Sequence, residues 1–501
     1  MRYNADLYQL IKSLTKSEKR YFKVYSAQHT KKESNNYILL FDAIDGQEVY
    51  NEEKIKRKFK NHTFGKHLAK TKFLLYESIM KVLLQLRSGK DVGSKIRLLL
   101  DAVEFQYGKS LYDQAYISLQ KAKKLVTFFE HYGIWIEVLE WEKKLQEYSD
   151  KMSQKQTLNS INKEYKLVKD LYSHEMNLAH LLQQVQSLAE TANKSPMNDL
   201  IIELEVLFKN RLITKYKAKT FLSRLYALEI FTHEAKAVKD FEVTFLRLND
   251  TYDLWQEHLE KMALFPYDFI RFCITYMKAS ISAKKKGVHY DELLDQMLKI
   301  HEIVQIDENK VFLMASMNDF IFNLSNENLE VCTIQLFTIK DLIEEHIHRL
   351  RLKDTITLYY HIGVFYFIKG EYRETLGWIE KIQNLDPENE FSNLQGYCHL
   401  LGLVSKYEEQ ELFQLDFELL KSYQFFDAKK TIHPVENIIL TYIGRLINAD
   451  HYDEEISLLT QFQNSLLRVR DRSLVYEMIA NQAIDHWVKG KISNKDIPLL
   501  N

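Results

Sequence analysis

Glycine, proline and cysteine are scarce in this chain. Its 501 residues include 14 glycines, 5 prolines and 3 cysteines. Glycine and proline together make up under 4% of the chain, against roughly 12% in an average soluble protein. Because tight turns and strand edges depend on these two residues, their scarcity excludes an all-β fold and argues against a parallel α/β fold. We predict an all-α protein with helix above about 70% of the chain.

Long apolar runs and paired cysteines are also missing. The longest apolar candidate, 362–368, is far shorter than the ~20 residues that cross a membrane, and the first residues lack the pattern of a secretion signal. Cys273, Cys332 and Cys398 stand singly in apolar helical pattern, so we predict that they are small core side chains. These features indicate a reducing, cytoplasmic location and no membrane partner.

Motifs of known catalytic and metal sites are absent from the sequence. The segment 88–90 lacks the preceding glycine and the spacing of a phosphate-binding loop. Signatures of serine hydrolases, zinc proteases, kinases and EF-hands do not occur. His346 and His348 point about 200° apart on a helix and cannot share a metal ion, whereas Glu344 and His348 share a face and are interpreted as a solvated pair. We predict no enzymatic activity, no metal and no cofactor.

Charge is distributed unevenly along the chain. The net charge is −1, from 68 lysines and arginines against 69 aspartates and glutamates. Residues 1–72 carry 16 basic and 8 acidic side chains, which leaves a charge of −9 on the other 429 residues. The sequence therefore predicts a basic N-terminal unit joined to a mildly acidic body.

The basic unit has the sequence pattern of a small helical domain. Thr15 and Glu18, three residues apart, form the pattern of a capping box, and Asn51 is placed to cap the basic helix that follows it. A longer amphipathic helix comes next and gives way to a polar segment with two glycines at 87–95. We therefore predict a basic helical domain over 1–90.

Cations are concentrated on the helix after Asn51 and on the start of the next helix. Like charges at this density repel one another unless solvent or a polyanion surrounds them. We interpret the cluster as a solvated face or a contact with the acidic body; the alternative is a nucleic-acid surface, although no recognition-helix turn is found. The cluster comprises Lys54, Lys56, Arg57, Lys58, Lys60, Lys66, Lys70 and Lys72. The predicted nucleic-acid contacts are Lys54, Arg57, Lys58, Lys66 and Lys70, which should then lie on one accessible surface.

The rest of the chain repeats a helix-pair pattern, most clearly over 356–389. The positions that carry the pattern are Tyr359, Ile362, Gly363, Tyr366, Gly370, Tyr372, Leu376, Ile379, Leu385 and Pro387. This segment resembles a tetratricopeptide repeat, a helix–turn–helix unit with a period of 34 residues, at about six of eight signature positions. We expect a turn at 369–371, with Gly363 where the two helices cross. Thr375 and Ile382 replace the small residues of the family and should push the helices apart.

Weaker units at 112–122 and 448–462 share the second-helix pattern. The resemblance implies an irregular right-handed solenoid of antiparallel helix pairs over 91–501. A glycine-free stretch predicts longer helices within 134–286, and the clearest of these spans 157–192 at near-heptad spacing. We expect this helix to form a hairpin inside the solenoid; a coiled-coil dimerisation arm is the alternative.

The resemblance also implies where a partner binds. In tetratricopeptide proteins, fixed positions of the first helix line an inner groove, and here these positions are Thr357, Tyr360, Val364, Phe367 and Ile368. They differ from the lysines and asparagines that clamp a C-terminal carboxylate, so that binding mode is not expected. The groove would suit an apolar helix or strand, unless the neighbouring hairpin buries it.

These features predict a non-catalytic cytoplasmic scaffold or adaptor that binds a protein or peptide through a helical-repeat groove. The main alternative is a nucleic-acid-associated regulator that uses the basic domain, and an enzyme with an unrecognised site ranks third. The salt dependence of binding distinguishes the scaffold from the nucleic-acid regulator, because binding to a polyanion through several lysines weakens steeply as the salt concentration rises. Neither the identity of the partner nor an oligomeric state follows from these residues.

Overall fold

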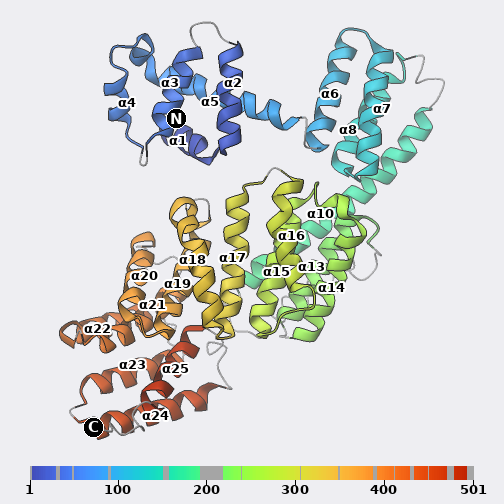
Figure 1. Ribbon diagram of the computed structural model, residues 1–501. Helices are drawn as coiled ribbons and strands as arrows, with labels where there is room; N and C mark the ends of the chain where they lie inside the picture. Colours follow the sequence, from blue (N-terminus) through green and yellow to red (C-terminus); the bar gives the residue numbers. More distant parts are fainter. Residues whose placement is uncertain are drawn as a thin grey trace. The chain divides into compact units, whose positions relative to one another are not determined.

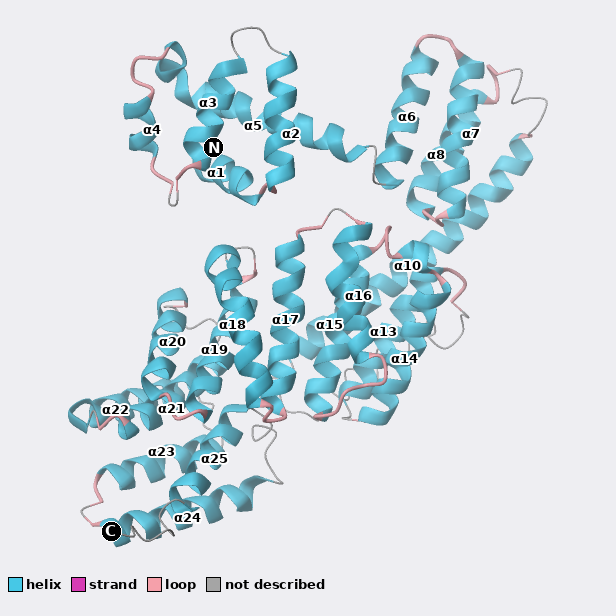
Figure 2. Cartoon of the chain, in the orientation of Figure 1, coloured by secondary structure: helices cyan, strands magenta, loops and turns pink. Residues whose placement is uncertain are grey.

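The protein is almost entirely helical (Figures 1 and 2). The computed structural model describes residues 3–29, 34–47, 50–88, 92–149, 157–191, 218–237, 240–304, 306–347, 350–386, 392–410, 412–428, 434–449, 451–470 and 479–493. Helices make up 87% of these residues, and no strand occurs among them. The 22 α-helices of the described ranges pack in adjacent pairs, which is compatible with a helical repeat. The all-α prediction is confirmed.

The chain divides into two compact units. One unit is Met1–His233 with Leu254–Phe265, and the other is Glu234–Asp253 with Pro266–Asn501. Helices α13 (Phe221–Ala237) and α14 (Phe241–Glu257) contribute residues to both units. In the described part of the chain, no helix combines the length and apolar composition needed to cross a bilayer.

The N-terminal helices enclose an apolar core of their own. These helices are α1 (Tyr3–Ser13), α2 (Lys16–His29), α3 (Ser34–Asp45), α4 (Glu52–Lys58), the 3-10 helix η1 (Thr63–His67) and α5 (Leu68–Ser88). Both predicted caps are confirmed: the Glu18 amide donates to Thr15 Oγ1 at 3.2 Å, and the Lys54 amide donates to Asn51 Oδ1 at 2.9 Å. The boundary predicted at residue 90 lies outside the described residues, so the division into 1–90 and 91–501 stays a prediction.

Four helices with a shared core follow in the first unit. They are α6 (Val92–Gly108), α7 (Tyr112–Phe128), α8 (Tyr132–Leu145) and α10 (Leu158–Thr191), and each packs against the next. The long helix expected over 157–192 is confirmed as α10, which has 34 residues. Ile161 and Val168 of α10 are buried in the same core as α8. The turn that would follow α10 in the expected hairpin lies outside the described residues, so the hairpin stays a prediction.

Five helix pairs make up most of the second unit. They are α15 (Pro266–Ala283) with α16 (Tyr290–Ile303), α17 (Glu308–Ser325) with α18 (Leu329–His346), α19 (Leu352–Ile368) with α20 (Tyr372–Leu385), α21 (Ser392–Glu408) with α22 (Leu412–Ala428), and α23 (Pro434–Ile447) with α24 (Tyr452–Arg470). The first helices of successive pairs also contact one another, from α15 through to α23. These first helices therefore form a continuous row, which we call the first-helix row.

The same left-handed turn ends four helices of this row. The residue in the turn has a positive φ at Lys284 (51°), Glu327 (59°), Gly370 (76°) and Gln410 (58°), and three of these residues are not glycine. This explains how so many turns form in a chain with little glycine, at about 1 kcal/mol of strain each. The turns at 284, 327, 370 and 410 are 43, 43 and 40 residues apart. These spacings are longer than the 34-residue period of a tetratricopeptide repeat, and the first helices of the array are 17 or 18 residues long.

The hairpin of α19 and α20 turns where the sequence predicts. Gly370 and Glu371 donate their amides to the carbonyls of Phe367 and Tyr366, at 3.0 and 2.9 Å, and so close the end of α19. Gly363 is buried at the helix crossing, where an added Cβ would lie 3.6 Å from the Trp378 Cβ. Thr375 is fully buried, and its hydroxyl donates to the Gly363 carbonyl at 3.3 Å. This departure from the family pattern therefore links the two helices. Pro387 lies outside the described residues.

The three cysteines are free and buried, as predicted for core side chains. Burial raises the pKa of the Cys398 thiol to about 12 and, together with nearby Asp319, does the same for Cys332. These thiols are therefore protonated and unreactive at neutral pH.

Candidate binding sites

The five cations predicted to contact nucleic acid are all exposed. Within the described residues, Lys54, Arg57, Lys58, Lys66 and Lys70 form no ion pair. The first three lie on one face of α4, three and four positions apart, whereas Ile55 and Phe59 turn into the core with 1% and 2% of their surface exposed. The apolar side chains thus fix α4 on the domain and leave its cations in solvent.

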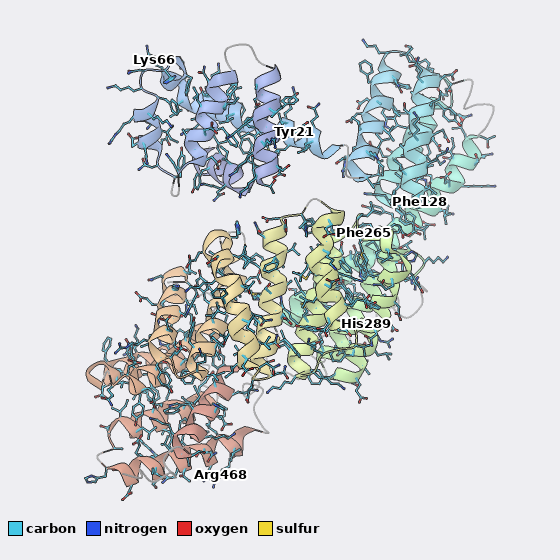
Figure 3. The ribbon with its side chains drawn as sticks, viewed as in Figure 1. Tyr21, Lys66, Phe128, Phe265, His289 and Arg468 are labelled. Atoms are coloured by element: carbon cyan, nitrogen blue, oxygen red, sulfur yellow. The ribbon has the colours of Figure 1, made fainter. Side chains whose placement is uncertain are left out.

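A close backbone contact joins the two parts of this basic surface. A Cβ on Gly65 would lie 2.0 Å from the carbonyl oxygen of Phe59, so this position requires glycine. The Phe59 and Phe64 rings also pack here, with their centroids 5.0 Å apart. Lys58 directly precedes Phe59, Lys66 directly follows Gly65, and Lys70 comes one helical turn later. Figure 3 shows Lys66 at the edge of this group of helices.

Two other cations of the cluster have local partners. Lys56 pairs with Glu53 at 2.9 Å and with Glu52 at 3.8 Å. Lys72 is buried; its Nζ donates to the Tyr50 hydroxyl at 2.7 Å and lies 3.2 Å from a Glu52 carboxylate oxygen. Burial lowers the pKa of Lys72 and, with Glu52, raises that of Tyr50 to about 12. Placing Lys72 with the exposed cations of the cluster was therefore wrong, because Tyr50 and Glu52 partner it in a buried position.

The predicted partner groove is mostly closed. Tyr360, Val364 and Phe367 are buried, with 2%, 0% and 2% of their surface exposed, while Thr357 and Ile368 are half-buried. The first three belong to a core that α19 shares with α21 and with the last described helix, α25 (Ile479–Ser493). The expectation that these three line an open groove is wrong, and the alternative of burial by neighbouring helices holds for them.

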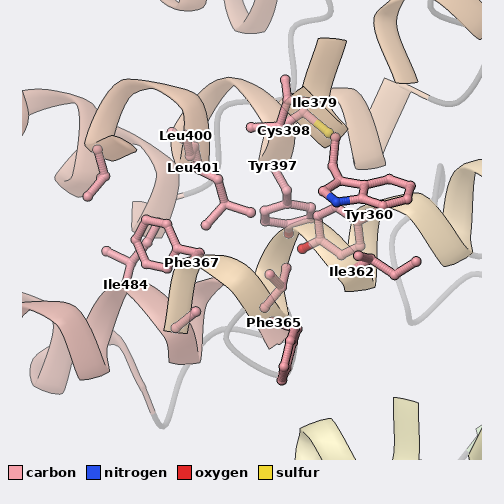
Figure 4. Packing of buried hydrophobic residues seen from close by; sticks show 14 of the residues in the cluster. Tyr360, Ile362, Phe365, Phe367, Ile379, Tyr397, Cys398, Leu400, Leu401 and Ile484 are labelled. Carbon is pink, nitrogen blue, oxygen red and sulfur yellow. The ribbon is translucent and has the colours of Figure 1, made fainter. Parts of the chain in front are cut away.

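Helix α25 covers α19 and α21 as an amphipathic helix. Its side chains Ala483, Ile484, Trp487 and Val488 are buried at the spacing of one helix face. His486, Lys489 and Ser493 are exposed. Figure 4 shows Ile484 of α25 beside Phe367 of α19. An apolar helix face thus packs beside Phe367, one of the positions where the resemblance implies a partner.

A carboxylate at the end of α21 holds α25 by two donors. The Trp487 indole Nε1 donates to Glu408 Oε1 at 2.9 Å, and Lys491 Nζ donates to Glu408 Oε2 at 2.9 Å. The Trp487 ring also meets the Tyr407 ring edge-on, with centroids 6.2 Å apart. Tyr407 in turn donates to Glu455 of α24 at 3.1 Å. Glu408 therefore recognises an indole and an ammonium that lie one turn apart on a helix.

Within the described part of the chain, the buried carboxylate of Asp485 in α25 has hydrogen-bond partners for only one of its two oxygens. Asp485 is 5% exposed, and its Oδ2 accepts a hydrogen bond from Lys489 at 2.7 Å. Its Oδ1 is buried and has no hydrogen-bond partner among the described residues. A buried carboxylate oxygen without a donor lowers the stability of the contact that buries it.

Buried carboxylates also link helices in the first unit. Glu142 of α8 is fully buried and accepts two hydrogen bonds from Lys123 of α7, at 3.0 and 2.8 Å. Lys123 also pairs with Glu164 of α10 at 2.8 Å. Glu175 of α10 accepts from the Thr220 hydroxyl at 2.5 Å, and burial raises its pKa to about 7. These groups join helices and are not arranged as a nucleophile with its base.

The described ranges contain no group of three or more His, Cys, Asp or Glu side chains that could hold a metal ion. Comparison of the chain with protein families, with curated proteins and with solved structures found no match. The candidate sites are therefore interpreted from their own geometry.

Sequence reasoning missed the contact between Trp487, Lys491 and Glu408. The apolar spacing over 483–488 indicates an amphipathic helix and could have identified α25. No local signal marks Glu408, which precedes Trp487 by 79 residues.

Proposed function

We propose that the protein is a non-catalytic cytoplasmic scaffold that binds a protein partner through its helical array, which we interpret as a right-handed tetratricopeptide-like solenoid. The observation that supports this proposal is that α19 and α21 of the first-helix row take up an amphipathic helix. They offer apolar surface to one face of that helix and the Glu408 carboxylate to its donors. An array that is already ordered binds a helix with little loss of its own conformational entropy.

A second candidate function has its own observation. Five cations of the basic domain are exposed and make no ion pair within the described ranges. A nucleic acid supplies phosphates that could neutralise several of them at once and would release counterions on binding. The second candidate is therefore a nucleic-acid-associated regulator that binds through Lys54, Arg57, Lys58, Lys66 and Lys70.

Affinity capture with the full chain separates the two functions. The wild type and a variant with these five cations changed to Glu are used as baits in native lysate, with and without nuclease. The scaffold proposal predicts one protein captured by both baits, resistant to nuclease and to moderate salt. Loss of that protein on nuclease treatment and with the variant would favour the nucleic-acid function. An unrelated helical protein serves as the control bait. If the wild type captures no protein that the control bait does not also capture, the scaffold proposal is contradicted.

A further inference from the structure

Helix α25 departs from the order of the array. Five pairs precede it, and in each pair the first helix contacts the first helix of the neighbouring pair. α25 packs against α24, as the chain order requires, but it also packs against α19 and α21, which lie further back in the sequence. It therefore lies across the first-helix row, as a bound ligand would, and does not extend the array by one more pair.

The contacts of α25 combine two kinds of recognition found in helix-binding grooves. Ala483, Ile484 and Val488 supply a buried apolar face. Trp487 and Lys491 supply two donors to one carboxylate at the end of the groove. Apolar contact gives affinity, and the carboxylate fixes the position and direction of the helix.

The fit is imperfect at Asp485. This carboxylate is buried, and its Oδ2 accepts a hydrogen bond from Lys489 within α25 itself. The other oxygen finds no donor among the described residues of α19 and α21. A helix with a small apolar residue at this position would occupy the same surface without that loss.

We propose that α25 is an intramolecular ligand that occupies the partner site, and that the partner displaces it with an amphipathic helix of its own. The partner helix carries apolar residues at the spacing of 483, 484, 487 and 488. It also carries tryptophan and lysine four positions apart to engage Glu408. This inference rests on the proposed function and specifies the chemistry of its partner. Because α25 is tethered, it competes at an effective concentration on the order of millimolar, so the free site is rarely open.

The probe for this proposal is a fluorescent peptide with the sequence of residues 479–493, in which Asp485 is replaced by alanine. Its binding to the full chain is measured by fluorescence anisotropy. Trp487→Ala in the chain weakens the tethered helix and should raise peptide affinity at least about tenfold over the wild type. Adding Glu408→Ala to that variant should abolish the gain, because the peptide then loses its carboxylate partner.

A substitution that should strengthen the binding of the tethered helix provides the matched control. Asp485→Ala in the full chain removes the unsatisfied carboxylate from the tethered helix, so peptide affinity should fall below that of the wild type. A peptide that also carries Trp487→Ala should not bind any of the chains. The proposal is overturned if the Trp487→Ala chain, with an unchanged circular dichroism spectrum, binds the peptide no better than the wild type does.

If Trp487→Ala unfolds the array, hydrogen exchange of the wild type provides a second test of the proposal. A displaceable ligand opens locally, so amides of α25 should exchange faster than those of α19 and α21. Equal protection of the three helices would show that α25 is a fixed part of the core. If the peptide fails but a partner is still captured by the full chain, the scaffold function stands and this inference alone is wrong.

Discussion

The basic N-terminal helices and the helices that follow them differ in where several of their charged side chains lie. In the first region, Lys54, Arg57 and Lys66 are exposed without a carboxylate partner among the described residues, and the core is built from apolar side chains. In the second, carboxylates such as Glu142 and Glu408 turn inward and join helices through lysine and tryptophan donors. The three exposed cations are therefore available to an external ligand, whereas the two inward carboxylates join helices of the fold.

The difference follows from architecture. Helices α1 to α5 surround one small apolar core. In a helical array each helix contacts few others, so long neighbouring helices could slide along one another. A buried hydrogen-bonded carboxylate opposes sliding, because moving it by one turn would leave a charge without a partner. Ion pairs also join segments of the N-terminal region: Lys19 of α2 lies 2.6 Å from an Asp45 carboxylate oxygen of α3, and Lys72 is buried beside Tyr50 and Glu52.

The largest effect should come from breaking an inward pair. Lys123→Met leaves Glu142 buried without its cation, and the free energy of unfolding should fall by about 3–5 kcal/mol. Lys54→Met, the matched change at an exposed lysine, should alter it by less than about 0.5 kcal/mol. Urea denaturation followed by circular dichroism measures both. Similar values for the two variants would contradict the contrast between inward and outward charge.

The outward charges are tested by ligand binding. Changing Lys54, Arg57, Lys58, Lys66 and Lys70 to Glu should weaken binding to duplex or single-stranded probes at least about 100-fold at ~100 mM salt, with helical content unchanged. The same charge change at five other exposed lysines should weaken it far less. Those control positions are Lys121, Lys285, Lys340, Lys353 and Lys421. A wild type without affinity for any probe at low salt would remove the nucleic-acid function.

The buried carboxyl of Glu175 predicts a dependence of stability on pH. Burial raises its pKa from 4.5 to about 7, so the folded state binds more protons than the unfolded state between these values. Stability should therefore fall as pH rises through this window. Glu175→Gln keeps an acceptor for Thr220 and should raise the free energy of unfolding by about 2–3 kcal/mol at pH 8, with little effect near pH 4.5. The exposed Glu140→Gln is the control, and equal effects of both variants at pH 8 would refute this prediction.

The smallest effect concerns an uncharged contact of the array. Gly363→Leu should overpack the crossing of α19 and α20 and lower the free energy of unfolding by about 1–3 kcal/mol. Gly363→Ala should be neutral or stabilise by about 0.5 kcal/mol, because its Cβ would sit at an ordinary 3.6 Å from Trp378. Thermal denaturation distinguishes the two. If alanine destabilises as much as leucine, the helices are packed more closely than the structure indicates.

Features that depend on neighbouring residues could be read from the sequence. The helical content, the caps at Thr15 and Asn51, the long helix α10 and the turn at Gly370 were all predicted correctly. Each arises from contacts within a few residues, where spacing alone determines which groups meet. The exposure of Lys54, Arg57 and Lys58 belongs to the same class, because Ile55 and Phe59 fix which face of α4 turns inward.

Tertiary structure decided the rest. Tyr360, Val364 and Phe367 are buried in a core to which α21 and α25 also contribute, and α25 follows α19 by more than a hundred residues. The partner of Trp487 is a glutamate 79 residues earlier, and no pattern of neighbours encodes that pairing. Lys72 has the sequence environment of a surface cation, yet it lies in the core because Tyr50 and Glu52 reach it from another segment. Local spacing determines helices and their faces, whereas the groups that a face covers are set by packing between distant segments.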